Sequence, residues 1–191
     1  GGAAAVHLSR SGLDVVLLER DAEPRIKPCG GGMAASVQKW FPFSLEPAVE
    51  QVVRQVDFSW CLGDPVVAEL PGEAPFWIVR RERLDQLLTD QAKQAGAECC
   101  AGVTVTDIGR DNDHWSVTAA DGQRWRTRSV VIADGSASPW PQRLGLGAKR
   151  VQTATTMSVR LEGQGRLKNG TTRFEFGLVK QGFAWAFPVA G

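Results

Sequence analysis

The chain opens with a small-residue helix that leads directly into an apolar strand. Residues 1–12 are rich in alanine and end in Ser11-Gly12, which is typical of a helix closed by glycine. Val15 to Leu18 is a continuous apolar run that ends at Glu19, as expected for a strand buried on both faces of a parallel sheet. A helix followed by such a strand is the later part of a β-α-β unit, so the sequence predicts an α/β fold.

The start of this helix and the acid after the strand suggest a dinucleotide site. A helix N-terminus offers unpaired backbone N–H groups to a pyrophosphate, and glycines at Gly1 and Gly2 let that backbone come close. An acid roughly 20 residues beyond a glycine motif accepts hydrogen bonds from ribose hydroxyls, which is the position of Glu19. The spacing fits if Gly1 is the last glycine of G-x-G-x-x-G. The alternative is a generic helix-strand pair.

Beyond Glu19, turn residues and periodicity predict the remaining elements. The first part has a loop, a short helix and strands that form an antiparallel insertion with turns at 63–65 and 71–72: loop 20–32, helix 33–40, and strands 52–61, 66–70 and 76–79. The second part has a helix and strands, one of them buried and placed directly before Ala133: helix 83–95, strands 98–108, 114–120 and 123–128, buried strand 129–132, and strands 153–161 and 172–177.

The most distinctive stretch of the sequence is the loop Lys27–Gly32, which reads K-P-C-G-G-G. Three consecutive glycines carry a large entropic cost when they become ordered, so a folded protein keeps them where another group approaches the backbone closely. A planar ring lying against the loop would explain them. A flexible surface loop is the alternative.

Charge and cysteine content exclude several classes of function. The 22 Lys+Arg residues nearly balance the 21 Asp+Glu residues, so no nucleic-acid partner is expected. The four cysteines lack the spacing of a metal site, which leaves a reduced, cytoplasmic setting as the simplest account. No apolar run approaches the ~20 residues of a membrane span. The chain begins without methionine, and we expect its true beginning upstream.

Four motifs together resemble the geranylgeranyl reductase family of FAD-dependent oxidoreductases, which is related to the flavin hydroxylases. They are K-P-C-G-G-G at 27–32, V-R-R-E-R-L-D at 79–85, A-D-G at 133–135 and F-A-W-A-F-P at 183–188. They occur in the family's order and span nearly the whole chain. The first is the most specific, whereas A-D-G and Glu19 mark only the wider flavoprotein fold.

The resemblance implies a Rossmann-like FAD-binding domain with a three-layer parallel sheet and an inserted antiparallel β substrate domain. We expect residues 1–48 and 81–148 to form the two parts of the FAD domain, residues 49–80 the β insertion, and residues 149–191 the truncated start of the substrate domain.

The resemblance also implies roles for individual residues. Glu19 would hold the ribose, Val105 would present its backbone to the adenine, and Cys29 is the one candidate for a reactive side chain near the flavin. Arg81 would reach a phosphate or ribose, although Arg80 competes for this role. The residues expected to bind FAD are Gly1, Gly2, Glu19, Arg20, Cys29, Gly30, Gly32, Arg81, Val105, Asp134 and Gly135. Those expected along the substrate are Phe183, Trp185 and Phe187.

The implied activity is reduction of carbon–carbon double bonds in a geranylgeranyl or other prenyl chain, with NAD(P)H or another reductant as electron donor. Phe183 departs from the family, which has Tyr there, so a hydroxyl is missing. A flavin monooxygenase or halogenase is one alternative, and an electron-transfer flavoprotein or an inactive fragment is another. The substrate would be a prenyl small molecule or lipid, which leaves peripheral membrane contact open. The oligomeric state is not encoded.

Overall fold

A computed structural model describes residues 1–147, 153–161 and 167–189, and the chain divides into two compact units. The first unit comprises Gly1–Arg25 and Asp85–Thr155, and the second comprises Ile26–Leu84 and Thr156–Gly191. Part of the expected substrate segment, residues 149–152, 162–166 and 190–191, lies outside the described residues. No described helix is long and apolar enough to cross a membrane.

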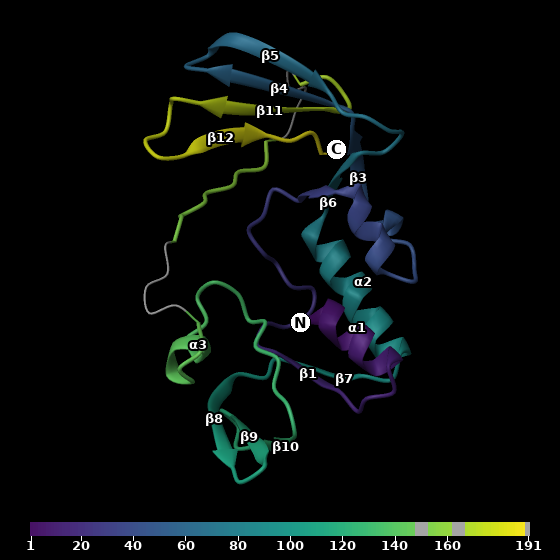
Figure 1. Ribbon diagram of the computed structural model, residues 1–191, viewed down its shortest axis with the longest axis vertical. Helices are drawn as coiled ribbons and strands as arrows, with labels where there is room; N and C mark the ends of the chain where they lie inside the picture. The colour runs from purple at the N-terminus through teal and green to yellow at the C-terminus, as the bar shows by residue number, and fades with distance from the viewer. Residues whose placement is uncertain (148–152, 162–166, 190–191) are drawn as a thin grey trace. The chain divides into compact units, whose positions relative to one another are not determined.

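The first unit contains the predicted helix and the parallel strand that follows it (Figure 1). Helix α1 (Gly2–Arg10) leads into β1 (Val16–Glu19), which pairs in parallel with β7 (Glu98–Ala101). The parallel pairing confirms the α/β prediction. The prediction that β1 is buried on both faces is wrong, because Val16 is 39% exposed and the rest of the strand is half-buried. In the described part of the chain β7 is the one strand bonded to β1, so an edge of β1 stays open.

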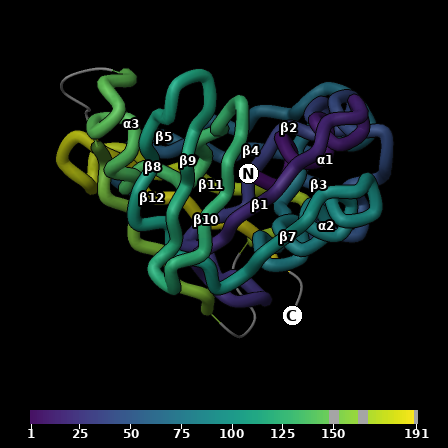
Figure 2. Tube along the Cα trace, turned by 90° about the horizontal axis from the view of Figure 1, so that it is seen from below, coloured from purple at the N-terminus to yellow at the C-terminus, as the bar shows by residue number. Residues whose placement is uncertain are grey.

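Three antiparallel strands follow and lie side by side in Figure 2: β8 (Val105–Asp111), β9 (His114–Ala119) and β10 (Arg124–Thr127). The prediction of a single strand over residues 98–108 is wrong, because Gly102 adopts φ +75° and separates β7 from β8. A buried cluster of Ile108, Val117 and Trp140 lies beneath the sheet, with Trp140 on the short helix α3 (Trp140–Arg143).

The expected buried strand at 129–132 does not form. Val130 and Ile132 pack against the Ile108 cluster, but Val131 is 61% exposed and the segment has no strand pairing. A strand needs a hydrogen-bonded neighbour, and no described backbone supplies one here. Residues 153–161 likewise form no strand. Their apolar side chains point to solvent, as the 86% exposure of Met157 illustrates.

The second unit contains two sheets (Figure 1). One has the order β12-β11-β4-β5, in which β11 and β4 are parallel and the other pairs antiparallel: β12 (Phe183–Ala186), β11 (Thr171–Phe176), β4 (Gln55–Trp60) and β5 (Gly63–Glu69). The other is antiparallel in the order β2-β6-β3: β2 (Gly32–Ala34), β6 (Phe76–Val79) and β3 (Val49–Val53). Helix α2 (Arg81–Gln94) begins after β6 and continues into the first unit.

Three boundaries in this unit differ from the sequence prediction. The expected strand 52–61 is two strands in different sheets, β3 and β4. The turn before β5 lies at Cys61 and Leu62, which have φ +48° and +64°, so Gly63-Asp64-Pro65 begins the strand. Met33 belongs to β2, and the short helix is a 3-10 helix over Ala35–Trp40. Local composition does not reveal which backbone groups find partners, and those partners set the boundaries.

Candidate functional site

Helix α1 begins without the usual side-chain groups of a helix start. Gly1 is the N-cap, no side chain caps it, and the first turn contains no acid. A side-chain carbon at Gly2 would lie 3.1 Å from Leu88 Cβ on α2, so Gly2 also permits close packing of the two helices. An uncapped, acid-free N-terminus suits an anion such as a pyrophosphate.

Glu19 ends β1 with its carboxylate 36% exposed. One oxygen, Oε1, accepts a hydrogen bond from the Asp21 backbone N–H at 3.1 Å, and Oε2 lies 3.4 Å from Arg25 Nε. A carboxylate has about four acceptor positions, so this one keeps capacity for ribose hydroxyls.

Arg25 is a residue that the sequence reasoning missed. Its guanidinium lies among three carboxylates: Nε is 3.4 Å from Glu19 and 3.6 Å from Asp21, and Nη1 is 3.5 Å from Asp85 at the start of α2. The side chain is 28% exposed. A basic residue in the loop soon after Glu19 was the available signal. Arg25 therefore joins the end of β1 to α2 and neutralises part of a concentrated negative charge.

Of the residues expected around the adenosine, Val105 follows a segment that lies beside the end of β1, whereas Asp134 lies in a separate turn. The Val103 N–H donates to the Glu19 carbonyl at 2.9 Å, so the segment leading to Val105 lies beside the end of β1. Asp134 and Gly135 lie in an exposed turn, where Gly135 adopts φ +95°. Within the described ranges, no contact links Asp134 to Glu19 or Val105.

In the second unit, aromatic rings lie against the glycine loop. A Cβ at Gly30 would come within 2.7 Å of Trp185 Nε1 and 2.8 Å of Phe187 Cε2. One at Gly32 would come within 2.8 Å of Phe76 Cζ and 3.0 Å of Phe187 Cε2. The close approach that the glycines implied is therefore made by the protein's own rings.

Gly31 is fixed by the neighbouring strand β6. It is buried with φ +79°, and a Cβ there would overlap the carbonyl oxygen of Val79. The Gly31 carbonyl in turn accepts the Val79 N–H at 2.9 Å. On the loop's own side, the Gly31 N–H donates to Cys29 Sγ at 3.4 Å, and Cys29 is exposed. The flexible-loop alternative does not hold, because backbone bonds and close packing fix these glycines.

The two candidate arginines at the start of α2 lie in different surroundings. Arg80 pairs with Glu50 at 2.5 Å, and the Glu50 side chain is 4% exposed. Arg160 lies 3.8 Å from the same carboxylate. Arg80 is thus committed to a buried acid, whereas Arg81 is the half-buried first residue of the helix. A phosphate or ribose role for Arg81 stays a prediction.

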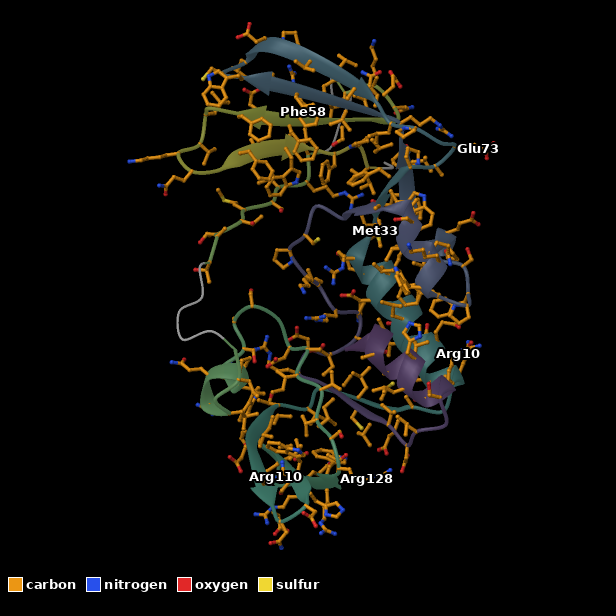
Figure 3. The ribbon with its side chains drawn as sticks, in the orientation of Figure 1. Arg10, Met33, Phe58, Glu73, Arg110 and Arg128 are labelled. Carbon is orange, nitrogen blue, oxygen red and sulfur yellow. The ribbon has the colours of Figure 1, made fainter. Side chains whose placement is uncertain are left out.

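One face of the sheet β12-β11-β4 is covered by aromatic side chains. Figure 3 labels Phe58 among the rings that gather on this sheet. Phe58 stacks on Phe174 at 5.8 Å between ring centroids, and Phe183 lies 5.9 Å from both Phe174 and Trp185. The sequence reasoning identified Phe183 and Trp185 but missed Phe58, Phe174 and Phe176. The alternation in Phe174-Glu175-Phe176 was the signal for one apolar face.

The opposite face of the same sheet carries a buried carboxylate. Glu175 is 6% exposed, accepts a hydrogen bond from the Ser59 hydroxyl, and accepts another from the Leu62 N–H at 2.8 Å. It lines a pocket of about 250 Å³ together with Arg173, Leu178 and Ala184. These two donors hold the pKa of Glu175 below its ordinary value of 4.5. Its bond to Leu62 fixes the turn between β4 and β5.

Glu175→Gln should therefore reduce stability at neutral pH and lose most of that effect in acid. A lowered pKa means that the carboxylate stabilises the fold above about 4.5, its pKa when unfolded, and that this contribution fades as pH falls through the folded pKa. Melting temperatures of both proteins between pH 7 and pH 3 test this. An equal difference at both ends of the range would contradict it.

The two cysteines of β7 are poor candidates for chemistry. Cys99 and Cys100 are half-buried in β7, and burial raises the pKa of both thiols. A raised pKa leaves them protonated at neutral pH, so neither is an activated nucleophile.

Known proteins resemble the chain over its whole length, although no family model matches it. It is 28% identical over 205 residues to menaquinone reductase of Mycobacterium tuberculosis, covering 99% of this chain and 50% of that protein. It is 29% identical over 165 residues to an Escherichia coli protein named "Probable electron transfer flavoprotein-quinone oxidoreductase YgcN", covering 84% of this chain and 39% of that protein. The chain thus spans about half or less of the length of these relatives.

Solved structures show the same fold. A geranylgeranyl bacteriochlorophyll reductase-like protein of Thermoplasma acidophilum matches with a TM-score of 0.81 and 19% identity, over 100% of this chain and 51% of that one. The halogenase PltM, solved with phloroglucinol and FAD, matches with a TM-score of 0.61 and 17% identity, over 76% of this chain and 34% of that one. The predicted resemblance is confirmed: the chain has the fold of these proteins and is similar in sequence to flavoprotein oxidoreductases.

Proposed function

We propose that this chain is the FAD-binding part of an oxidoreductase that reduces carbon–carbon double bonds of a prenyl chain. The observation that carries the proposal is the packing of the K-P-C-G-G-G loop on the F-A-W-A-F-P strand, which joins the most family-specific motif and the motif expected along the substrate in one unit. The fold shared with the Thermoplasma reductase-like protein supports it.

FAD would be held mainly by main-chain groups and by carboxylates. The start of α1 at Gly1 and Gly2 would face the pyrophosphate, and Glu19 would accept hydrogen bonds from the ribose hydroxyls. FAD, when bound, would supply the redox chemistry, which is hydride transfer with NAD(P)H or another reductant as the electron source. The remaining residues proposed to contact FAD are Arg20, Cys29, Gly30, Gly32, Arg81, Val105, Asp134 and Gly135.

The aromatic face supports an apolar substrate. Phe183 is 46% exposed and Phe58 is 36% exposed, so the face presents hydrocarbon surface. In the strand register, the side chain of Thr172 is the polar one that shares this face with Phe174 and Phe176. The buried Thr172 hydroxyl donates to the Ala186 carbonyl at 3.0 Å, so a prenyl chain, which has no hydrogen-bonding groups, would leave this hydroxyl paired. Because Phe183 lacks a hydroxyl, the proton that accompanies the hydride must come from another group or from water.

Two other functions have specific support. The FAD-bearing halogenase has a related fold, which favours oxygen chemistry, and the relative named for electron transfer to quinone favours a carrier role. The test incubates the purified protein with FAD, a reductant and a panel of prenyl lipids, and follows lipid mass and oxygen consumption. A mass gain of one hydrogen molecule per double bond supports prenyl reduction. Oxygen consumption with an unchanged lipid, or reduction of a quinone ring alone, would overturn it.

Glu19→Ala should weaken FAD binding by about tenfold or more, because a hydrogen bond to a charged group contributes about 1.5–3 kcal/mol. The measurement is quenching of flavin fluorescence on titration of apoprotein. Asp14→Ala is the matched control, since it removes an exposed acid just before the same strand. Equal affinities for the Glu19 variant and the wild type would remove Glu19 from the site.

Cys29→Ala tests the one candidate reactive side chain. If the thiol takes part in the reaction, the variant loses prenyl reduction even when it is saturated with FAD. If Cys29 only accepts the hydrogen bond from Gly31, the variant reduces prenyl lipids at the wild-type rate. Single-turnover oxidation of the reduced protein by substrate separates these results from changes in binding.

A further inference from the structure

We infer that Trp185 and Phe187 are positioning residues for the glycine loop 27–32, and that they order the loop before any ligand binds. In this role their rings pack against the loop backbone. The inference rests on the proposed function only in its last step, that the ordered loop then receives the flavin.

The contacts of the two rings support this role. Trp185 Nε1 and Phe187 Cε2 lie within 2.7 and 2.8 Å of the place where a Cβ on Gly30 would stand, and Phe187 also reaches Gly32. Both rings are half-buried. Phe187 packs edge-on against Phe174 at 5.8 Å and Phe76 at 6.5 Å between centroids. Neighbouring rings from both sheets of the unit therefore fix its position.

The other side of the loop is held by β6. The Gly31 carbonyl accepts a hydrogen bond from the Val79 N–H, and Gly32 pairs with Ile78 where β2 runs beside β6. The loop thus lies between a strand edge and two aromatic rings. Ordering a glycine costs more conformational entropy than ordering any other residue, so three in succession need compensating contacts. The backbone bonds reach Gly31 and Gly32, and the Trp185 and Phe187 rings supply the contact at Gly30.

Phe183 provides an internal comparison. It lies on β12 with Trp185, but its ring neighbours are Phe174, Phe176 and Trp185, and it is 46% exposed. The nearest atoms around Gly30 and Gly32 come from Trp185, Phe187 and Phe76. Of the three aromatic residues in this motif, Phe183 is therefore the one suited to meet substrate, whereas the other two support the loop.

Hydrogen exchange of the apoprotein, followed by mass spectrometry, tests the inference without flavin. Trp185→Ala should speed exchange in the peptide covering residues 27–34 by about tenfold, the change expected when local opening becomes easier by about 1.4 kcal/mol. Phe183→Ala should leave that peptide unchanged, and Trp185→Phe should restore most of the protection. The β8-β9 hairpin provides a reference peptide in the other unit.

Gly30→Ala approaches the same contact from the loop side. Its added methyl group meets the Trp185 ring, so Gly30→Ala should also speed hydrogen exchange in residues 27–34. In the Trp185→Ala background the ring is gone, so Gly30→Ala should add a smaller increase there. This variant keeps the test decisive if Trp185→Ala fails to fold. Unchanged exchange in both variants, or an equal effect of Phe183→Ala, would overturn the inference.

A parallel flavin titration separates this inference from the proposed function. If Trp185→Ala loosens the loop and raises the FAD dissociation constant by about tenfold, corresponding to 1.4 kcal/mol, both stand. If wild type binds no FAD but the exchange pattern is as expected, the proposed function fails and the positioning role stands. If wild type binds FAD and loop exchange never changes, only the positioning role fails.

Discussion

Gly31→Ala should lower the stability of the protein by about 3 kcal/mol, since the left-handed conformation costs a non-glycine residue about 1–2 kcal/mol and overpacking adds about 1–3. Gly31 adopts φ +79°, and its added methyl group would overlap the Val79 carbonyl oxygen. For a chain of this size the melting temperature should fall by roughly 10 °C. Thermal unfolding followed by circular dichroism measures the change.

Gly72→Ala is the matched control for this substitution. Gly72 lies in the same unit with φ +96°, and nothing stands within 4 Å of the place where its Cβ would lie. It therefore reports the conformational cost alone, about 1–2 kcal/mol. If the two variants were equally stable, close packing of the loop on β6 would contribute nothing, and the account of the glycine loop would be wrong.

Arg25→Ala should destabilise the first unit by about 1–2 kcal/mol, which is less than the loss of a fully buried partner because the side chain is 28% exposed. The change leaves Glu19, Asp21 and Asp85 without their shared cation. Loss of this cation makes the end of β1 more negative, which should oppose the phosphates of FAD, so the FAD dissociation constant should rise, most strongly at low salt. Urea unfolding and flavin titration at two salt concentrations measure both effects.

Arg20→Ala separates the local role of Arg25 from a general loss of positive charge. Arg20 pairs only with Asp21 among the described residues, at 3.3 Å, and its side chain is 74% exposed. Such surface pairs contribute about 0–1 kcal/mol, so this variant should remain near wild type in stability. Equal destabilisation by both variants would show that the three-carboxylate arrangement has no special role.

Much of the site could be predicted from sequence because its signals are local. The apolar run ending at Glu19 and the K-P-C-G-G-G loop are each visible in neighbouring residues: Glu19 ends a parallel strand, and the loop glycines are closely packed. The role of Arg25 could not be predicted from neighbouring residues, because it depends on an ion pair with Asp85, which is distant in sequence. The same holds for Phe58 and Phe174, which become neighbours only through the parallel pairing of β4 with β11.

From the sequence, three consecutive glycines indicated a close neighbour, because ordering such a triplet is costly without one, but a flexible loop stayed open as the alternative. The sequence also determined a helix and strand ending in an acid, through periodicity and capping. The folded structure shows that the neighbours of the loop are the Trp185 and Phe187 rings and the Val79 carbonyl. It also decided that residues 129–132 and 153–161 form no strands. Strand pairing and ring packing join residues far apart in the chain, and no local pattern specifies such contacts.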